Sequence, residues 1–282
     1  MNILSSTADD YNRWKAKKLE SFTTDLEELT VQISSPNEVS KHEKSRVISM
    51  LRNNNLVFFH IDNVRFTDKL SIKNMAHQIG LGNYELDSQS DKDGLTEIRD
   101  MEHNDLENEY VPYTNKELNW HTDGYYTDQK NSILSWLLFC KTSAETGGTN
   151  KYLDHEIAYI LFNNKSSDLK DLMLDDACCI PENLMTERKK IFNPVFMFNN
   201  EKLHMKFSMR EKNIIWNDNS LESVNILKKI IKESSDYHIV KKLEAGSGVI
   251  TNNVIHMRTA FTNSENKNRL LYRLRSKKRV AD

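Results

Sequence analysis

Two short segments that lie far apart in the chain constrain its fold more than any other feature. The first is Asn119–Tyr126, in which a histidine and an aspartate stand two residues apart, at His121 and Asp123. The second is the small and apolar run Gly246–Ile255, which predicts a strand and leads directly to His256. Residues i and i+2 of a strand point to the same face, so His121 and Asp123 can both reach one metal ion from a strand end. A chain that brings His256 to the same point needs a β-rich core.

These three side chains form a donor set that suits iron. Two imidazoles and one carboxylate on one face of an iron leave positions open for a co-substrate and O2, as in the facial triad of non-haem Fe(II) oxygenases. Each half of the pattern is common by itself, in surface strands and in core histidines. The first half gains weight from the aromatic flanks at Trp120, Tyr125 and Tyr126, and from Gly124, which permits a turn or bulge.

Two arginines strengthen the second half of the pattern. Arg269 stands thirteen residues after His256, and Arg273 follows four residues later. Arginine is the side chain best suited to bidentate recognition of a carboxylate in a closed site. A metal triad beside such an arginine suits a 2-oxo acid, whose keto and carboxylate oxygens chelate the metal while the arginine holds the distal carboxylate.

Hydrophobic periodicity predicts a β-rich chain that also carries helices. We expect helices at 7–29, 41–52, 68–79, 154–162, 166–174 and 221–233. We expect strands at 56–61, 95–99, 132–140, 194–198, 203–208, 213–216, 239–243, 248–252 and 269–274. Asn199 and Asn200 predict a hairpin turn. The fold class expected is β-rich α+β, a jelly-roll core with N-terminal and inserted helices.

The composition indicates one domain. The chain has 282 residues, of which 38% are hydrophobic, enough for a sizeable core. With 4 Pro and 8 Gly there is no sign of a flexible linker. We therefore expect one domain over residues 1–282, with a helical part at about 1–85 and the jelly-roll core at about 86–282.

Charge and cysteine content exclude several classes of protein. A net charge of −2 gives no field that favours nucleic acid or an anionic membrane, and the basic run Arg273–Arg279 is typical of a solvated terminus. No apolar run approaches the roughly 20 residues that span a bilayer. Three cysteines, with Cys178 and Cys179 adjacent, argue against a disulfide framework. A cytoplasmic protein without nucleic-acid or membrane partners is expected.

Three pieces of the sequence resemble one known family in order and spacing. They are Trp120-His121-Thr122-Asp123, the turn Gly147-Gly148-Thr149-Asn150, and His256 with Arg269 and Arg273. They look like the taurine-dioxygenase (TauD/TfdA) group of Fe(II)/2-oxoglutarate-dependent oxygenases, which includes the γ-butyrobetaine hydroxylase-like enzymes. The resemblance implies a double-stranded β-helix and O2 as a co-substrate. It also implies iron bound by His121, Asp123 and His256, and 2-oxoglutarate held by Arg269.

Some positions carry finer expectations. Members of the group often bind 2-oxoglutarate with a threonine at the second position after the Gly-Gly turn; here that position is Asn150, preceded by Thr149, and both can donate a hydrogen bond. We favour Asn150. Arg273 either touches the metal-side carboxylate or pairs with acidic neighbours. Because Asp123 is retained where related halogenases have a small residue, hydroxylation is the expected outcome.

The substrate side is less constrained. Candidate substrate residues are Asn119, Tyr125, Tyr126, Arg210 and Arg258, with Tyr113, His204 and Asn253 as further candidates. Arg210 or Arg258 either pairs with an anionic group of a small substrate or makes a structural salt bridge. The segment 100–113 is predicted to be a lid over the site.

Two other functions stay open from the sequence. One is a catalytically silent jelly-roll protein that binds a small molecule, and the other is a Zn-dependent hydrolase with the same triad. A homodimer is expected only from base rates.

Overall fold

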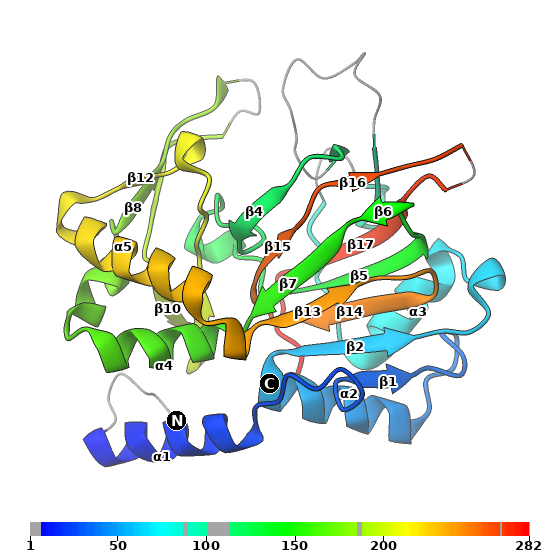
Figure 1. Ribbon diagram of the computed structural model, residues 1–282, viewed down its shortest axis with the longest axis horizontal. Helices are drawn as coiled ribbons and strands as arrows, with labels where there is room; N and C mark the ends of the chain where they lie inside the picture. Colours follow the sequence, from blue (N-terminus) through cyan, green and yellow to red (C-terminus); the bar gives the residue numbers. More distant parts are fainter. Residues whose placement is uncertain (1–6, 87–89, 101–112, 185–187, 266, 282) are drawn as a thin grey trace.

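Two facing β-sheets form the centre of the protein, seen in the computed structural model that describes residues 7–86, 90–100, 113–184, 188–265 and 267–281 (Figure 1). The larger sheet has the order β1 (Thr30–Gln32), β2 (Leu56–His60), β14 (Ser247–Thr251), β5 (Ser135–Thr142), β17 (Leu270–Ser276) and β3 (Leu95–Arg99). The smaller sheet has the order β13 (Ile239–Lys242), β7 (Thr149–Leu153), β15 (Ile255–Arg258) and β4 (Leu118–His121). The predicted jelly-roll core with helices is confirmed.

Alternation along the strands divides the residues between two cores. On β5, Leu137 and Phe139 pack with helix residues on the outer face of the larger sheet. Trp136 and Cys140 pack between the sheets, where they meet Tyr152 of the smaller sheet. The space between the sheets is therefore lined by every second residue of each strand.

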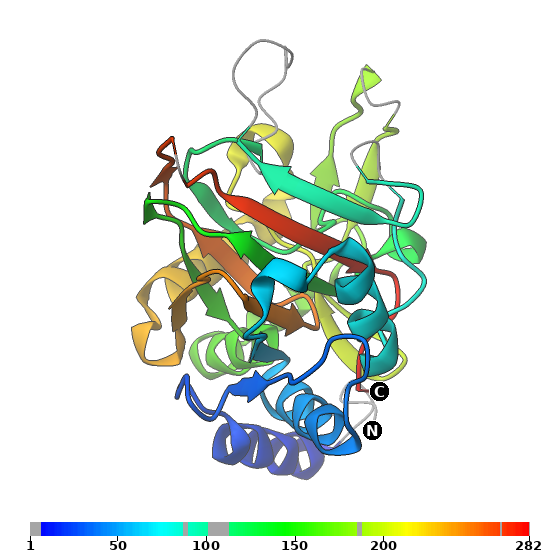
Figure 2. The same ribbon diagram turned by 90° about the vertical axis from the view of Figure 1, so that its right-hand side faces the viewer.

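Three N-terminal helices and two inserted helices surround the sheets. They are α1 (Ala8–Ser21), α2 (Lys41–Asn54), α3 (Lys69–Ile79), α4 (His155–Lys165) and α5 (Asp218–Glu233). Capping boxes start α1 at Thr7 and α2 at Ser40, and Asn55 ends α2 in the left-handed conformation. Helix α3 lies against the outer face of the larger sheet, as the side view shows (Figure 2).

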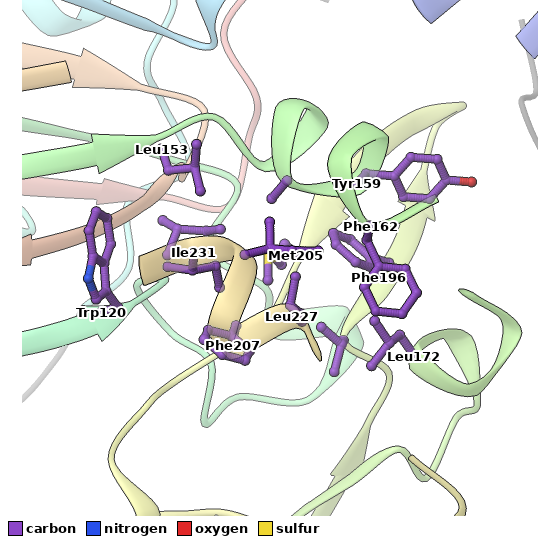
Figure 3. Close-up of a cluster of buried hydrophobic side chains, with 14 of the residues drawn as sticks. Trp120, Leu153, Tyr159, Phe162, Leu172, Phe196, Met205, Phe207, Leu227 and Ile231 are labelled. Carbon is purple, nitrogen blue, oxygen red and sulfur yellow. The ribbon is translucent and has the colours of Figure 1, made fainter. Parts of the chain in front are cut away.

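Helices α4 and α5 enclose a third core on the far side of the smaller sheet. Its members come from both helices and from the hairpin of β10 (Phe196–Asn199) and β11 (Lys202–Met205), and Trp120 of β4 borders it (Figure 3). Because Trp120 points into this core, its neighbour His121 must point to the opposite face, between the two sheets.

Smaller elements lie between these within the described ranges. The strands are β6 (Thr146–Gly147), β8 (Cys178–Ile180), β9 (Ile191–Asn193), β10 (Phe196–Asn199), β11 (Lys202–Met205), β12 (Ile215–Trp216) and β16 (Phe261–Thr262). The 3-10 helices are Val64–Phe66, Gln129–Asn131, Asp168–Met173, Glu211–Asn213 and Ser235–Tyr237. The predicted hairpin is confirmed: β10 and β11 pair antiparallel, and Asn200 takes a positive φ of 47° in the turn.

Several expected elements are wrong in extent or type. The helix expected at 7–29 ends at Ser21, where Phe22 adopts an extended backbone. The helix expected at 166–174 is a short 3-10 helix. Strands β7, β8 and β9 were not expected, because their short runs carry little alternation. No helix among the described residues is long and apolar enough to cross a membrane.

Candidate active site

His121, Asp123 and His256 meet between the two sheets. Nε2 of His121 lies 3.6 Å from Oδ1 of Asp123, and Nε2 of His256 lies 3.8 Å from the same oxygen. One donor atom from each residue falls within 4.8 Å of the other two. These separations exceed hydrogen-bonding distance, so the three donors surround a common point without bonding strongly to one another. We refer to these three residues and Arg273 as the ligand cluster.

Strand pairing brings the two histidines together. β4 and β15 run antiparallel, and His121 stands directly opposite His256 in the register. The sequence expectation that His256 ends the preceding strand is wrong. β14 ends at Thr251, the chain turns through 252–254, and His256 belongs to β15 of the other sheet. The change of sheet is what carries the second imidazole across to the first.

Asp123 lies beyond the end of its strand. β4 ends at His121, so the simple two-residue alternation expected for the pair is wrong at Asp123. The chain turns at Gly124, whose φ is +66°. A side chain there would place its Cβ 2.5 Å from Cγ1 of Ile133, so glycine is needed for both the turn and the close approach. The turn returns the carboxylate to the imidazoles.

Hydrogen bonds to main-chain carbonyls orient both imidazoles. Nδ1 of His121 lies 2.8 Å from the carbonyl oxygen of Asn119, and Nδ1 of His256 lies 3.0 Å from that of Val254. A proton on each Nδ1 donates to its carbonyl and leaves Nε2 with a free lone pair toward the centre. Both rings are thereby held in the tautomer that a metal requires.

The charge states also suit a metal. Burial, followed by the nearby His121, lowers the pKa of His256 to about 3, so this imidazole is neutral. Burial alone raises the pKa of Asp123, but contact with His121 and the Arg273 guanidinium outweigh it and hold the pKa well below its usual range. Nη1 of Arg273 lies 4.0 Å from Oδ2 of Asp123. The neutral imidazole of His256 and the ionised carboxylate of Asp123 therefore face the centre beside the His121 ring, the donor chemistry that fits Fe(II).

A cavity opens beside the cluster. Its described lining consists of Ile98, Leu118, His121, Asp123, Trp136, Leu138, Asn150, His256, Arg258, Arg269, Leu271 and Arg273. Trp136, Leu138, Leu118, Ile98 and Leu271 were not singled out from the sequence. Trp136 and Leu138 could have been found, because they are alternate residues of a strand that was expected.

Two arginines share one aromatic ring at one end of the cavity. The guanidinium carbons of Arg258 and Arg269 each lie 4.8 Å from the ring centre of Phe261. Burial and the mutual repulsion of the two cations lower the pKa of Arg258 to about 9, and burial lowers that of Arg269 to about 10. Nη1 of Arg269 and Nε of Arg258 are buried and have no hydrogen-bond partner within the described ranges. This end of the cavity thus offers donors to an anion.

Asn150 and Thr149, the two alternatives after the Gly-Gly turn, lie on opposite faces of β7. Asn150 is buried, lines the cavity, and stands directly opposite Arg258 across the β7–β15 pair. Thr149 points to the other face of β7, and its N–H donates to Oγ1 of Thr259 at 3.0 Å. Of the two, the structure brings Asn150 beside the arginines.

Most residues suggested for the substrate lie elsewhere. Arg258 lines the cavity, but its Nη2 donates to the carbonyl oxygens of Thr114 (2.9 Å) and Lys116. Asn119 is exposed, and its Oδ1 accepts from the Trp120 N–H. Tyr125 packs in a small apolar cluster with Cys178.

The remaining suggestions also lie outside the cavity lining. The hydroxyl of Tyr126 accepts from Arg275, and the half-buried Arg210 is not among the described lining residues. His204 lines a separate cavity, and Tyr113 packs between the sheets. The lid predicted at 100–113 falls mostly on residues 101–112, which lie outside the described residues.

Comparison with known proteins gives matches in family and in fold. A family model described as "Taurine catabolism dioxygenase TauD, TfdA family" matches residues 15–168. No curated protein matches the sequence.

Solved structures share the fold at low sequence identity. An asparagine oxygenase in complex with Fe(II), 2S,3S-3-hydroxyasparagine and succinate has a TM-score of 0.64 at 10% identity, over 98% of this chain and 93% of that one. A taurine dioxygenase from Burkholderia xenovorans has a TM-score of 0.57 at 17% identity, over 90% and 88% of the two chains. The non-heme iron oxygenase OrfP in complex with Fe and alpha-ketoglutaric acid has a TM-score of 0.58 at 14% identity, over 86% and 83%.

Proposed function

The chain belongs to the TauD/TfdA family, and from this membership we propose that its ligand cluster is the iron site of an Fe(II)/2-oxoglutarate-dependent dioxygenase. The reaction is the oxidation of a small molecule, with hydroxylation as the expected outcome. The observation that carries the proposal is the convergence of His121, Asp123 and His256, with both Nε2 atoms directed at one point. When bound, Fe(II) with 2-oxoglutarate and O2 supplies the oxidising power, and succinate and CO2 are released.

Arg269 is proposed to hold the distal carboxylate of 2-oxoglutarate. Its buried guanidinium lies beside the cavity with Nη1 unbonded within the described part of the chain, and its fork geometry matches a carboxylate. Asn150 adds a side-chain amide donor from β7. Arg258 lies across from Asn150 and over the same Phe261 ring as Arg269, which supports a role on the co-substrate side rather than on the substrate side.

The apolar lining and Arg273 have separate proposed roles. Leu118, Leu138 and Leu271 limit the access of water to the cavity, which protects a reactive site from side reactions. Arg273, with Nη1 4.0 Å from Oδ2 of Asp123, acts together with His121 to keep that carboxylate ionised, the state in which it can bind a cation. Thr149 is not assigned a contact, because it faces away from the cavity.

An anaerobic titration tests the proposal. Apo-protein is titrated with Fe(II) and 2-oxoglutarate and followed by visible absorption, with His121→Ala and Arg269→Ala as test variants. Arg210→Ala serves as the control, since Arg210 is outside the described cavity lining. A weak charge-transfer band that needs both additions, persists in the control and is lost in both test variants is expected. A wild-type protein that gives no band would overturn the proposal.

A succinate assay then separates an oxygenase from a silent binding protein. Amino acids and small sulfonates are the first compounds to screen, because the similar structures include an asparagine oxygenase and a taurine dioxygenase. Succinate that rises above the level without substrate identifies a substrate. A band without succinate for any compound would favour the silent binder.

Three broader expectations are also proposals. One domain is supported by the packing of α2 and α3 residues on the larger sheet, which leaves the helical N-terminal part no separate core. A homodimer rests on base rates for soluble proteins, and light scattering after size exclusion measures it. A cytoplasmic location rests on the sequence argument given above.

A further inference from the structure

We infer that Asn253 is a positioning residue that fixes two of the three proposed metal ligands, Asp123 and His256. The inference rests on the proposed iron site and adds a residue that does not touch the metal. Asn253 lies in the short connection between β14 and β15, where the chain passes from one sheet to the other. It is fully buried and has a positive φ of 59°, a conformation that asparagine tolerates better than most residues.

The side-chain amide of Asn253 holds the peptide groups on both sides of Asp123. Its Oδ1 accepts from the Asp123 N–H at 2.8 Å, and its Nδ2 donates to the Asp123 carbonyl at 2.9 Å. The amide therefore pairs with the aspartate backbone as a neighbouring strand would. Because Asp123 lies beyond the end of β4, this pairing replaces the strand hydrogen bonds that it lacks.

The Asn253 amide also bonds Trp136, whose ring packs against His256. Oδ1 accepts a second hydrogen bond from Nε1 of Trp136 at 3.2 Å. The Trp136 ring lies 4.8 Å from the His256 ring, centre to centre, and lines the cavity. A hydrogen bond that fixes the indole thus limits the positions that the imidazole can take.

A fourth hydrogen bond ties in the turn after Asp123. Nδ2 donates to the carbonyl of Ile133 at 2.6 Å, and Ile133 is the residue that packs against Gly124. An asparagine amide has two donors and two acceptor positions, so all four are in use. No atom of this amide remains for a substrate, and the earlier suggestion of Asn253 as a substrate residue is not supported.

Asn252 provides a matched control. It is as buried as its neighbour, but its bonds lead away from the cluster. Its Nδ2 donates to Oδ1 of Asn55 at 3.2 Å, and its Oδ1 accepts from the Val280 N–H at 3.1 Å. Truncation of either asparagine leaves buried polar groups without partners and should lower stability by roughly 1–3 kcal/mol per lost partner. The loss should be larger for Asn253, which makes four side-chain hydrogen bonds, than for Asn252, which makes two.

The experiment compares Asn253→Ala with Asn252→Ala. Fe(II) affinity is measured anaerobically by the charge-transfer band in saturating 2-oxoglutarate, and the free energy of unfolding by urea denaturation of the apo-proteins. We expect both variants to be destabilised. Only Asn253→Ala should bind Fe(II) more weakly, by roughly 10- to 100-fold, as is typical of residues that orient metal ligands.

Trp136→Phe keeps the test decisive if Asn253→Ala does not fold. This variant removes one of the four hydrogen bonds and keeps an aromatic ring at His256, so its Fe(II) affinity should fall by less than that of Asn253→Ala but measurably below that of Asn252→Ala.

The outcomes separate the two proposals. A wild-type protein without a band would overturn the proposed function and this inference together. A normal wild-type band with equal Fe(II) affinity in Asn252→Ala and either test variant would overturn the inference alone.

Discussion

Two buried clusters of charged residues differ in the distances between their charged atoms. In the ligand cluster the nitrogen atoms of His121, His256 and Arg273 lie 3.6 to 4.0 Å from the oxygens of the Asp123 carboxylate. In the second cluster, which we call the Lys18 cluster, Nζ of Lys18 lies 2.6 Å from Asp154 and 2.7 Å from Glu156. Asn55 also donates to Asp154. The charged atoms of the ligand cluster are therefore separated by a gap, whereas those of the Lys18 cluster are in direct contact.

The difference shows how to tell a structural from a functional charged cluster. Burying charges is costly unless they are paired and hydrogen-bonded. The Lys18 cluster meets this requirement internally and joins α1 to the start of α4. In the ligand cluster the two imidazoles donate hydrogen bonds to main-chain carbonyls, which orient the rings. The Asp123 carboxylate stays available for an added cation. Composition alone does not distinguish them, since both contain histidine neighbours and carboxylates.

The largest expected effect is on the Lys18 cluster. Lys18→Met removes the cation that both carboxylates share and should lower the free energy of unfolding by about 3–5 kcal/mol. Fe(II) affinity should not change. Urea denaturation measures the first quantity and the charge-transfer titration the second. Lys15→Met is the control, because Lys15 lies on the same helix as Lys18 but bonds an exposed asparagine, Asn164 of α4. Equal stability of the two variants would contradict the assignment.

A metal ion should stabilise the protein through the ligand cluster only. At a Mn(II) concentration of one hundred times Kd, the wild type should gain about 2.7 kcal/mol in the free energy of unfolding. Asp123→Ala should gain nothing, whereas Lys18→Met should keep the full increment. Thermal or urea denaturation with and without metal measures this. A metal-dependent gain in Asp123→Ala would place the ion elsewhere.

Substitution of Arg269 should weaken the binding of 2-oxoglutarate. Arg269→Gln removes a charge-assisted hydrogen-bonded pair. The binding free energy of 2-oxoglutarate should weaken by about 1.5–3 kcal/mol, roughly ten- to hundredfold in affinity. Arg258→Gln should have a smaller effect, because two of its hydrogen bonds already go to main-chain carbonyls. Titration of 2-oxoglutarate into the Fe(II) protein gives both values. A larger effect at Arg258 would reverse the order of the two arginines.

The smallest effect is the pH dependence of the Lys18 cluster. Burial raises the pKa of Glu156, but the Lys18 ammonium and neighbouring cations outweigh it and hold the pKa below its ordinary 4.5. Below pH 4.5 the unfolded chain therefore binds more protons than the folded one. Stability is lost as the pH falls, by at most about 1.4 kcal/mol per pH unit from this group. The loss should be flatter in Lys18→Met, and parallel profiles would contradict the assignment.

The sequence predicted the elements whose signals are local. α3 and β3 match their expected ranges within one residue, because caps and hydrophobic periodicity mark them. The change of sheet after Thr251 was not predictable, since the run to His256 stays apolar on both sides of two asparagines. For the same reason the sequence pattern placed Asn253 among the candidate substrate residues. Its burial and its bond to Asp123 depend on contacts far apart in sequence, which no local pattern reports.

The pairing of β4 with β15 also determines when the site can exist. Asp123 and Asn253 are 130 residues apart in sequence. At ribosomal rates of about 5–20 residues per second, roughly 7–27 seconds separate the synthesis of the first two proposed iron ligands, His121 and Asp123, from that of the third, His256. Closure of this long loop, rather than formation of the local helices, is the costly step in assembling the site. Iron loading is therefore an event that follows synthesis, and a nascent chain exposes His121 and Asp123 without their partner.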